Sequence, residues 1–99
     1  MSAGVKTRIL FRSKHFNIYL VSYPEGHQVR PHVDMVARGK LYKLNCVLAR
    51  PQSGGTFVCE KKLFDLFGRV VLFRPDLYEH QVEKITRGKR LLLSFALNV

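Results

Sequence analysis

The chain has little of several residue types, and each shortage excludes a class of protein. It has no tryptophan and only two cysteines in 99 residues, and Cys46 and Cys59 form no CxxC pair. A disulfide scaffold is therefore excluded, and we expect both thiols to be reduced and buried in a cytoplasmic protein. No apolar run approaches the ~20 residues that a membrane helix needs, so we expect no membrane contact. The first residues also lack the apolar core of a secretion signal.

Acidic residues are scarce as well. The chain has 7 acidic and 17 basic residues, which give a formal net charge of +10. The cations are spread along the sequence, as on a solvated surface, but they could also attract a polyanion. A basic nucleic-acid-binding domain is therefore one alternative for the function, although no aromatic RNA-binding motif supports it.

The length predicts one domain, residues 1–99, with a single hydrophobic core. Short segments rich in Val, Ile, Leu, Phe and Tyr alternate with turn formers, which is typical of an all-β sandwich or jelly-roll barrel with little helix. The eight expected strands are Thr7–Ser13, Phe16–Tyr23, Gln28–Asp34, Lys40–Ala49, Thr56–Lys62, Arg69–Pro75, Tyr78–Ile85 and Lys89–Val99.

The breaks between these segments have local causes. Pro24-Glu25-Gly26 and Gly54-Gly55 are turn chemistry, and we expect a hairpin turn at the glycine pair. Gly88 predicts a tight turn before the last strand. Only Lys61–Phe67 could form a short helical turn.

One histidine and one carboxylate stand two residues apart, at His32 and Asp34. On a strand this spacing puts both side chains on one face, ~6.6 Å apart along the chain. His80, on a later expected strand, could supply a third ligand. Two histidines and one carboxylate form the facial triad of non-haem iron(II), which leaves coordination positions open. Each residue alone is more simply interpreted as a loop or surface group.

A candidate anion site follows His80 along the chain. Arg90 and Ser94 are four residues apart, so on a strand they share a face. A guanidinium binds a carboxylate through two hydrogen bonds, and a hydroxyl can add one more. An arginine directed into an apolar barrel needs such an anionic partner.

The order of these elements resembles the iron(II)/2-oxoglutarate-dependent oxygenases, in particular the prolyl-hydroxylase-like branch, from about residue 16 to residue 95. The segments that carry the resemblance are Tyr23-Pro-Glu-Gly, His32-Val-Asp34, Gly54-Gly55-Thr-Phe, Val71-Leu-Phe-Arg-Pro and His80-x9-Arg90.

The resemblance implies a double-stranded β-helix, or jelly roll, with His32, Asp34 and His80 as metal ligands at its mouth. It further implies that Arg90 binds the distal carboxylate of 2-oxoglutarate and that Ser94 assists. Further cofactor-binding candidates are Tyr23, Asn45 and Tyr42; the last two have opposite parity on one strand, so only one can point inward.

The implied activity is a dioxygenase that uses Fe(II), 2-oxoglutarate and O2, releases succinate and CO2, and hydroxylates or demethylates a substrate. The substrate could be a protein side chain, a small molecule or a nucleic acid. Arg30 and Arg38 flank the metal motif and could contact an anionic substrate, whereas His15 and His27 are expected to be exposed.

The chain departs from the family in lacking a helix before the expected barrel, so we expect a minimal or trimmed barrel. A catalytically silent metal-binding jelly roll is the second alternative. An exposed sheet edge would allow a monomer or a dimer.

Overall fold

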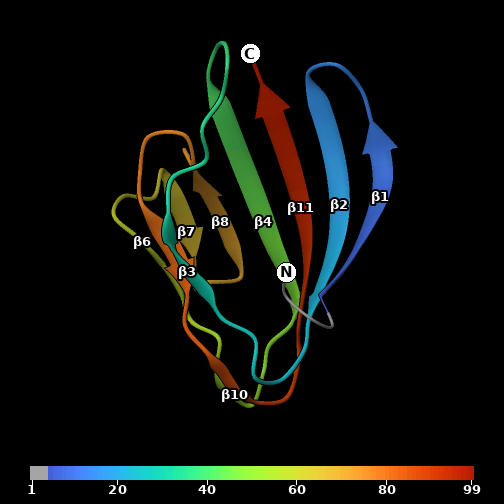
Figure 1. Cartoon of the computed structure of the whole chain (residues 1–99), viewed down its shortest axis with the longest axis vertical. Helices are drawn as coiled ribbons and strands as arrows, with labels where there is room; N and C mark the ends of the chain where they lie inside the picture. The colour runs from blue at the N-terminus through green and yellow to red at the C-terminus, as the bar shows by residue number, and fades with distance from the viewer. Residues whose placement is uncertain (1–4) are drawn as a thin grey trace.

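The computed structural model describes residues 5–99, which form eleven β-strands and no helix. Six strands make one large antiparallel sheet, which runs from the right of Figure 1 through the centre to the left of centre. In spatial order they are β1 (Lys6–Arg12), β2 (Phe16–Tyr23), β11 (Arg90–Asn98), β4 (Leu41–Ala49), β8 (Val70–Phe73) and β7 (Phe64–Leu66).

Two smaller sheets complete the molecule. One has the order β3 (Val29–His32), β9 (His80–Val82) and β6 (Phe57–Cys59), and the other pairs β10 (Ile85–Arg87) with β5 (Ser53–Gly54). The ring of Phe57 packs against that of Phe73 from the large sheet, with centroids 4.9 Å apart. The three-stranded sheet therefore faces the large one, and the predicted all-β jelly-roll class is confirmed.

The core lies between the facing sheets and follows the two-residue period of strands. On β11 the buried side chains alternate with half-buried ones, from Arg90 through Leu92 and Ser94 to Ala96. Phe73 and Ile85 are the largest fully buried apolar side chains among those described. Two of the buried β11 residues are polar, so the core interior is also where a polar site can form.

Three expectations about local structure were wrong. Lys61–Phe67 holds no helical turn, because its apolar residues form β7 and pair with the edge of β8. Gly54-Gly55 is not a simple hairpin turn, because Gly54 pairs with Ile85 of β10. The segment Tyr78–Ile85 is not one strand but β9 followed by the start of β10. Each difference depends on a partner strand that is distant in sequence.

No helix among residues 5–99 has the length and apolar character to cross a membrane.

Candidate metal centre

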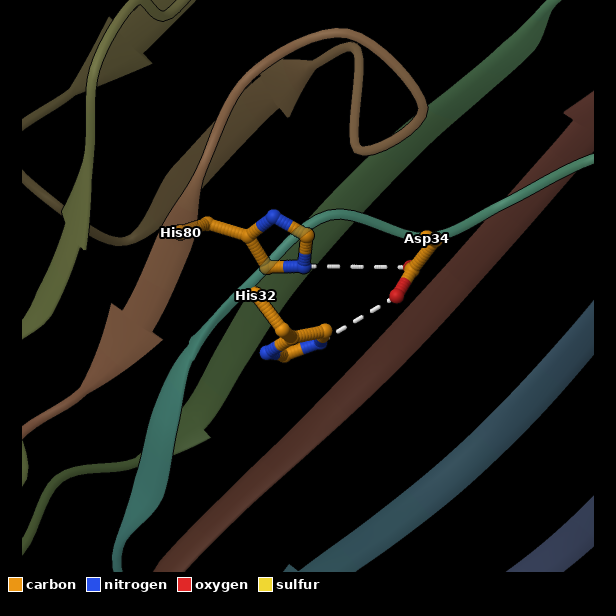
Figure 2. A group of neighbouring side chains, drawn as sticks. All are labelled: His32, Asp34 and His80. Atoms are coloured by element: carbon orange, nitrogen blue, oxygen red, sulfur yellow. Dashed lines mark ion pairs between the residues drawn. The ribbon is translucent and has the colours of Figure 1, made fainter.

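The pairing of β3 with β9 places two histidines side by side. His32 and His80 are directly opposed in this antiparallel ladder, and their ring centroids are 4.3 Å apart. Asp34 lies beyond the end of β3, so the expectation that it shares a strand with His32 was wrong. Its backbone N–H instead donates to the carbonyl of Pro75 at 2.8 Å. This hydrogen bond holds the loop after β3 against the segment that follows β8 of the large sheet. Figure 2 shows the Asp34 carboxylate facing both imidazoles.

The three side chains present their ligand atoms to a common point. His32 Nε2 lies 3.1 Å from Asp34 Oδ1, and His80 Nε2 lies 3.7 Å from Asp34 Oδ2. One ligand atom from each residue falls within 4.8 Å of the others. Ligands that bind one ion at ~2.1 Å and at right angles lie ~3 Å apart, so the spacing fits a facial set of three.

Both imidazoles are oriented by main-chain carbonyls. His32 Nδ1 lies 2.8 Å from the carbonyl oxygen of Arg30, and His80 Nδ1 lies 3.0 Å from that of Tyr78. If each Nδ1–H donates to its carbonyl, each Nε2 keeps a lone pair that faces Asp34. This is how metal-binding histidines are usually fixed.

Burial also suits His80 to this role. Burial lowers the pKa of His80, with smaller opposing effects from the Tyr78 carbonyl and the Asp34 carboxylate. The imidazole is therefore neutral at neutral pH, as a metal ligand must be. His32 is more open, with 42% of its side chain exposed, so one side of the centre is accessible from outside.

A cavity of about 410 Å³ joins this centre to the interior of the large sheet. It contains all three candidate ligands together with the predicted co-substrate residues Arg90, Ser94, Tyr23 and Asn45. The remaining lining residues are Val5, Thr7, Tyr19, Val21, Val29, Lys43, Phe57, Phe73, Gln81, Val82 and Leu92.

Arg90 is a buried cation without an acidic partner. Its relative exposure is 4%, and no carboxylate of residues 5–99 lies within 4.0 Å of it. Its Cζ lies 5.8 Å from the centre of the Tyr23 ring, and the two residues are partners in the β2–β11 ladder. Burial lowers the pKa of Arg90, because the charged guanidinium loses hydration in the interior. An anion in the cavity would offset that loss.

Ser94 and Asn45 form one polar unit on the cavity wall. Ser94 Oγ donates to Asn45 Oδ1 at 2.7 Å, and both residues are buried. Of the two candidates with opposite parity, Asn45 is therefore the inward one. Tyr42 lies on the other face of β4, where the Arg74 guanidinium sits 4.9 Å from its ring centre, and it is not among the described residues that line the cavity.

The structure does not bring the other weighed residues to the centre. Arg30 and Arg38 are exposed and lie outside the described cavity lining. The His27 ring stacks on the Tyr23 ring with centroids 5.1 Å apart; His27 is half-buried rather than exposed and is not among the described residues that line the cavity. His15 Nδ1 contacts the carbonyl of Asn98 at the far end of the large sheet.

The cysteines are free and half-buried, and they lie on different sheets. Cys46 is on β4 of the large sheet, whereas Cys59 is on β6 of the three-stranded sheet. The prediction that both thiols are buried was wrong, because each is only half-buried.

Sequence reasoning missed several residues of the cavity. Tyr19 was not singled out, although its four-residue spacing from Tyr23 on β2 puts both on one face. Lys43 also lines the cavity, two residues before Asn45 and therefore on the same face of β4. Phe73, whose ring lies 5.3 Å from that of His80, carried no local signal that could have placed it beside the metal motif.

The comparisons with solved structures define the class of fold. The chain is similar to a cupin superfamily protein from Desulfitobacterium hafniense, with a TM-score of 0.67, 19% identity, and coverage of 100% of this chain and 82% of that one. It is also similar to an RmlC-like cupin protein from Desulfovibrio desulfuricans, with a TM-score of 0.61, 18% identity, and coverage of 94% and 81%. KdgF from a Halomonas species matches with a TM-score of 0.60, 13% identity, and coverage of 97% and 80%. The fold is thus a cupin-like jelly roll.

The family is shown by the sequence. Residues 15–98 match the family model of the 2OG-Fe(II) oxygenase superfamily, which is most of the chain. The protein belongs to this superfamily. No curated protein sequence matches the chain.

Proposed function

We propose that this protein is an iron(II)- and 2-oxoglutarate-dependent dioxygenase that hydroxylates or oxidatively demethylates its substrate. One observation carries the proposal: the His32, Asp34 and His80 cluster and the unpaired, buried Arg90 line the same cavity. A metal-binding cluster alone fits many cupins. A cluster that shares a cavity with a buried cation fits a metal plus an anionic co-substrate.

Each residue has a distinct role in this proposal. The Nε2 atoms of His32 and His80 and the Asp34 carboxylate hold iron(II), and the Arg90 guanidinium binds the distal carboxylate of 2-oxoglutarate. When bound, the iron supplies oxidative decarboxylation of 2-oxoglutarate by O2, which yields succinate and CO2 and transfers an oxygen atom to the substrate.

The remaining cavity residues orient the co-substrate and exclude water. The Asn45 amide, held by Ser94, and the Tyr23 hydroxyl can add hydrogen bonds beside Arg90. Burial raises the pKa of Tyr23, so its hydroxyl stays protonated and can donate. Phe57 and Phe73 pack against His80 and keep that side of the centre dry.

The experiment that tests the proposal is an anaerobic titration. Iron(II) is added to the protein, then 2-oxoglutarate, and the visible spectrum is followed for a metal-to-ligand charge-transfer band. We expect the band with 2-oxoglutarate and its absence with succinate, which lacks the keto group. Failure to form the band at saturating co-substrate would refute the proposal.

A catalytically silent metal-binding cupin is the second candidate, supported by the cupin-like fold. It predicts metal binding without the charge-transfer band and without succinate release in air. The two candidates are therefore separated by the same titration followed by oxygenation.

Three finer assignments belong to the proposal as well. The resemblance of residues 23–34 and 80–90 supports the prolyl-hydroxylase-like branch. The free thiols support a reducing compartment such as the cytoplasm. Lys43 at the cavity wall and the net charge of +10 favour an anionic substrate over a cationic one.

A further inference from the structure

The outward face of the large sheet is apolar from one edge to the other. Cross-strand partners share a face, and the registers align Phe11, Ile18, Phe95, Leu44, Leu72 and Phe64 in one row across all six strands. The neighbouring row is Arg8, Leu20, Leu93, Cys46, Val70 and Leu66. Both rows have the parity opposite to buried Ser94, so they point away from the metal cavity.

An apolar outer face is unusual for a sheet of this kind. An antiparallel sheet with one solvated face normally carries polar residues on that face. Here β11 reads Leu91-Leu-Leu-Ser-Phe-Ala-Leu97 and is apolar on both sides. The outward residues at the sheet edges are about half exposed, at 49% for Phe11 and 50% for Phe64. A contiguous exposed apolar patch of several hundred Å² on a protein surface marks an interaction site.

The size of the face matches one partner of a standard interface. The six strands hold 40 residues, and at ~4.8 Å between strands and ~3.3 Å per residue they cover ~630 Å². That area lies at the lower end of the ~600–1,000 Å² that each partner of a standard stable complex buries.

The charges on the face favour one arrangement. The unpaired charges among these outward residues lie at the β1 edge, at Arg8 and, one row along, Lys6, whereas Arg74 beside Tyr42 is already paired with Asp76. A two-fold axis in the interface plane and perpendicular to the strands would place β1 over β1 of the other copy, so that the edges carrying Lys6 and Arg8 face each other. An axis parallel to the strands, between β11 and β4, instead places β1 over the apolar β7 of the other copy. No like charges then meet, and the apolar centres coincide.

We propose that a second copy of this chain covers the face, in a two-fold dimer with the two large sheets packed face to face. Stacked sheets pack ~10 Å apart with their strands roughly aligned. The metal cavities then open on the outside of the dimer, on the opposite side of each sheet. The proposal does not depend on the proposed activity.

This arrangement places Cys46 of one copy opposite Cys46 of the other. A two-fold axis parallel to the strands keeps each residue at its own height, and β4 lies next to the centre of the sheet. The two Cys46 residues therefore face each other at the same height, with backbones ~11 Å apart, from ~10 Å between sheets and ~5 Å between strands. Cys59 lies on the small sheet, away from this interface.

The test combines sedimentation velocity with thiol cross-linking by a short bis-maleimide. We expect a dimer at micromolar concentration, a covalent dimer from the parent and from Cys59→Ser, and none from Cys46→Ser. A monomer at ~100 µM, or cross-linking that depends on Cys59, would overturn the proposal.

A second test introduces a charged side chain in the middle of the outward face and measures the dimer Kd. Leu93→Glu should raise the dimer Kd by at least ~100-fold, because it buries a carboxylate in an apolar interface. The matched control Lys84→Glu, an exposed site on the other layer, should leave the dimer intact. Circular dichroism establishes that both variants fold. A folded Leu93→Glu protein with unchanged dimerisation, or a parent monomer that binds anionic lipid vesicles, would contradict a self-association face.

Discussion

The same kind of main-chain contact orients both histidines of the metal centre. Each Nδ1 lies within hydrogen-bond distance of the main-chain carbonyl two residues earlier, so each Nε2 is left as the acceptor. This orientation requires no metal, because the strand geometry of β3 and the entry to β9 supply it. The Asp34 carboxylate then adds the negative charge that a divalent cation needs.

Loss of Asp34 should weaken the metal site more than any change outside it. Asp34→Ala removes a direct ligand, and since the loss of supporting partners alone costs about 10–100-fold, we expect iron(II) affinity to fall by more than ~100-fold. Competition with a chromogenic chelator measures this. Glu83→Ala, an exposed acid near β9, is the control and should bind iron like the parent. Equal affinity in Asp34→Ala would show that this ligand assignment is wrong.

Arg90→Ala should separate co-substrate binding from metal binding. A buried charge-assisted pair contributes about 2–4 kcal/mol, so the Kd for 2-oxoglutarate should rise roughly 30- to 1000-fold. Iron(II) affinity should not change, because Arg90 is not a ligand. Isothermal titration with and without the metal gives both values, and exposed Arg87→Ala is the control. A parallel loss of both affinities would indicate a structural role for Arg90 instead.

One ion pair outside the site should give the protein an acid-sensitive step. Arg74 donates from Nε to Asp76 Oδ1 at 2.9 Å and from a terminal nitrogen to Oδ2 at 2.6 Å, and this arginine lowers the pKa of Asp76. Because the folded-state pKa lies below the unfolded one, the pair stabilises the fold above about pH 4. That contribution disappears as pH falls through the lowered pKa.

Urea unfolding between pH 2 and 7 measures this contribution. The parent should lose stability below about pH 4, and Asp76→Asn should show a flatter profile in that window. Asp65→Asn, at an exposed pair with Lys62, is the comparison and should change the profile less. An unchanged profile in Asp76→Asn would mean that other carboxylates control acid unfolding.

At the scale of elements, the site depends on short strands that have little stability alone. β3 has four residues and β9 has three, yet their pairing brings His32 opposite His80. The two-stranded ladder of β5 and β10 supports the same end of the fold through Ile85, which is fully buried. The glycines beside that ladder allow the chain to approach it closely.

Gly54 should be much less tolerant of substitution than Gly26. Both have positive φ, at 75° and 87°, so alanine is strained at either position. A Cβ at Gly54 would also overlap the Lys84 carbonyl, whereas a Cβ at Gly26 would meet nothing within 4 Å. We expect Gly26→Ala to cost about 1 kcal/mol and Gly54→Ala about 2–4 kcal/mol. Urea denaturation measures both, and equal losses would mean that β5 shifts freely.

At the scale of the whole molecule, the formal charge of +10 opposes folding through self-repulsion. Raising NaCl from 20 to 300 mM at fixed protein concentration should screen this repulsion. Tm should rise by about 4–8 °C, which corresponds to a gain of ~1 kcal/mol in the free energy of unfolding for a domain of this size. A double substitution of exposed cations, Lys14→Glu with Lys84→Glu, should reduce the increase. A fall in Tm with salt would show that attractive ion pairs dominate instead.

Strands with strong local signals were predictable, and those that depend on a partner were not. Phe16–Tyr23 was predicted with its observed bounds, because its eight residues combine β-branched and aromatic side chains between turn formers. Phe64–Leu66 was not predicted, because three residues become a strand only beside β8. Asp34 was placed on a strand because its two-residue spacing from His32 looks the same whether or not the strand continues.

The sequence alone determined the all-β class, the candidate metal ligands and the Arg90–Ser94 pair, because side-chain chemistry and the two-residue period are local properties. Only the tertiary structure decided that β3 pairs with β9, that Asn45 rather than Tyr42 faces the cavity, and that Arg90 shares this cavity with the metal cluster. It also decided that the second apolar face of β11 stays uncovered by residues 5–99. These facts depend on register between distant strands, where a shift of one residue would turn each side chain to the other face.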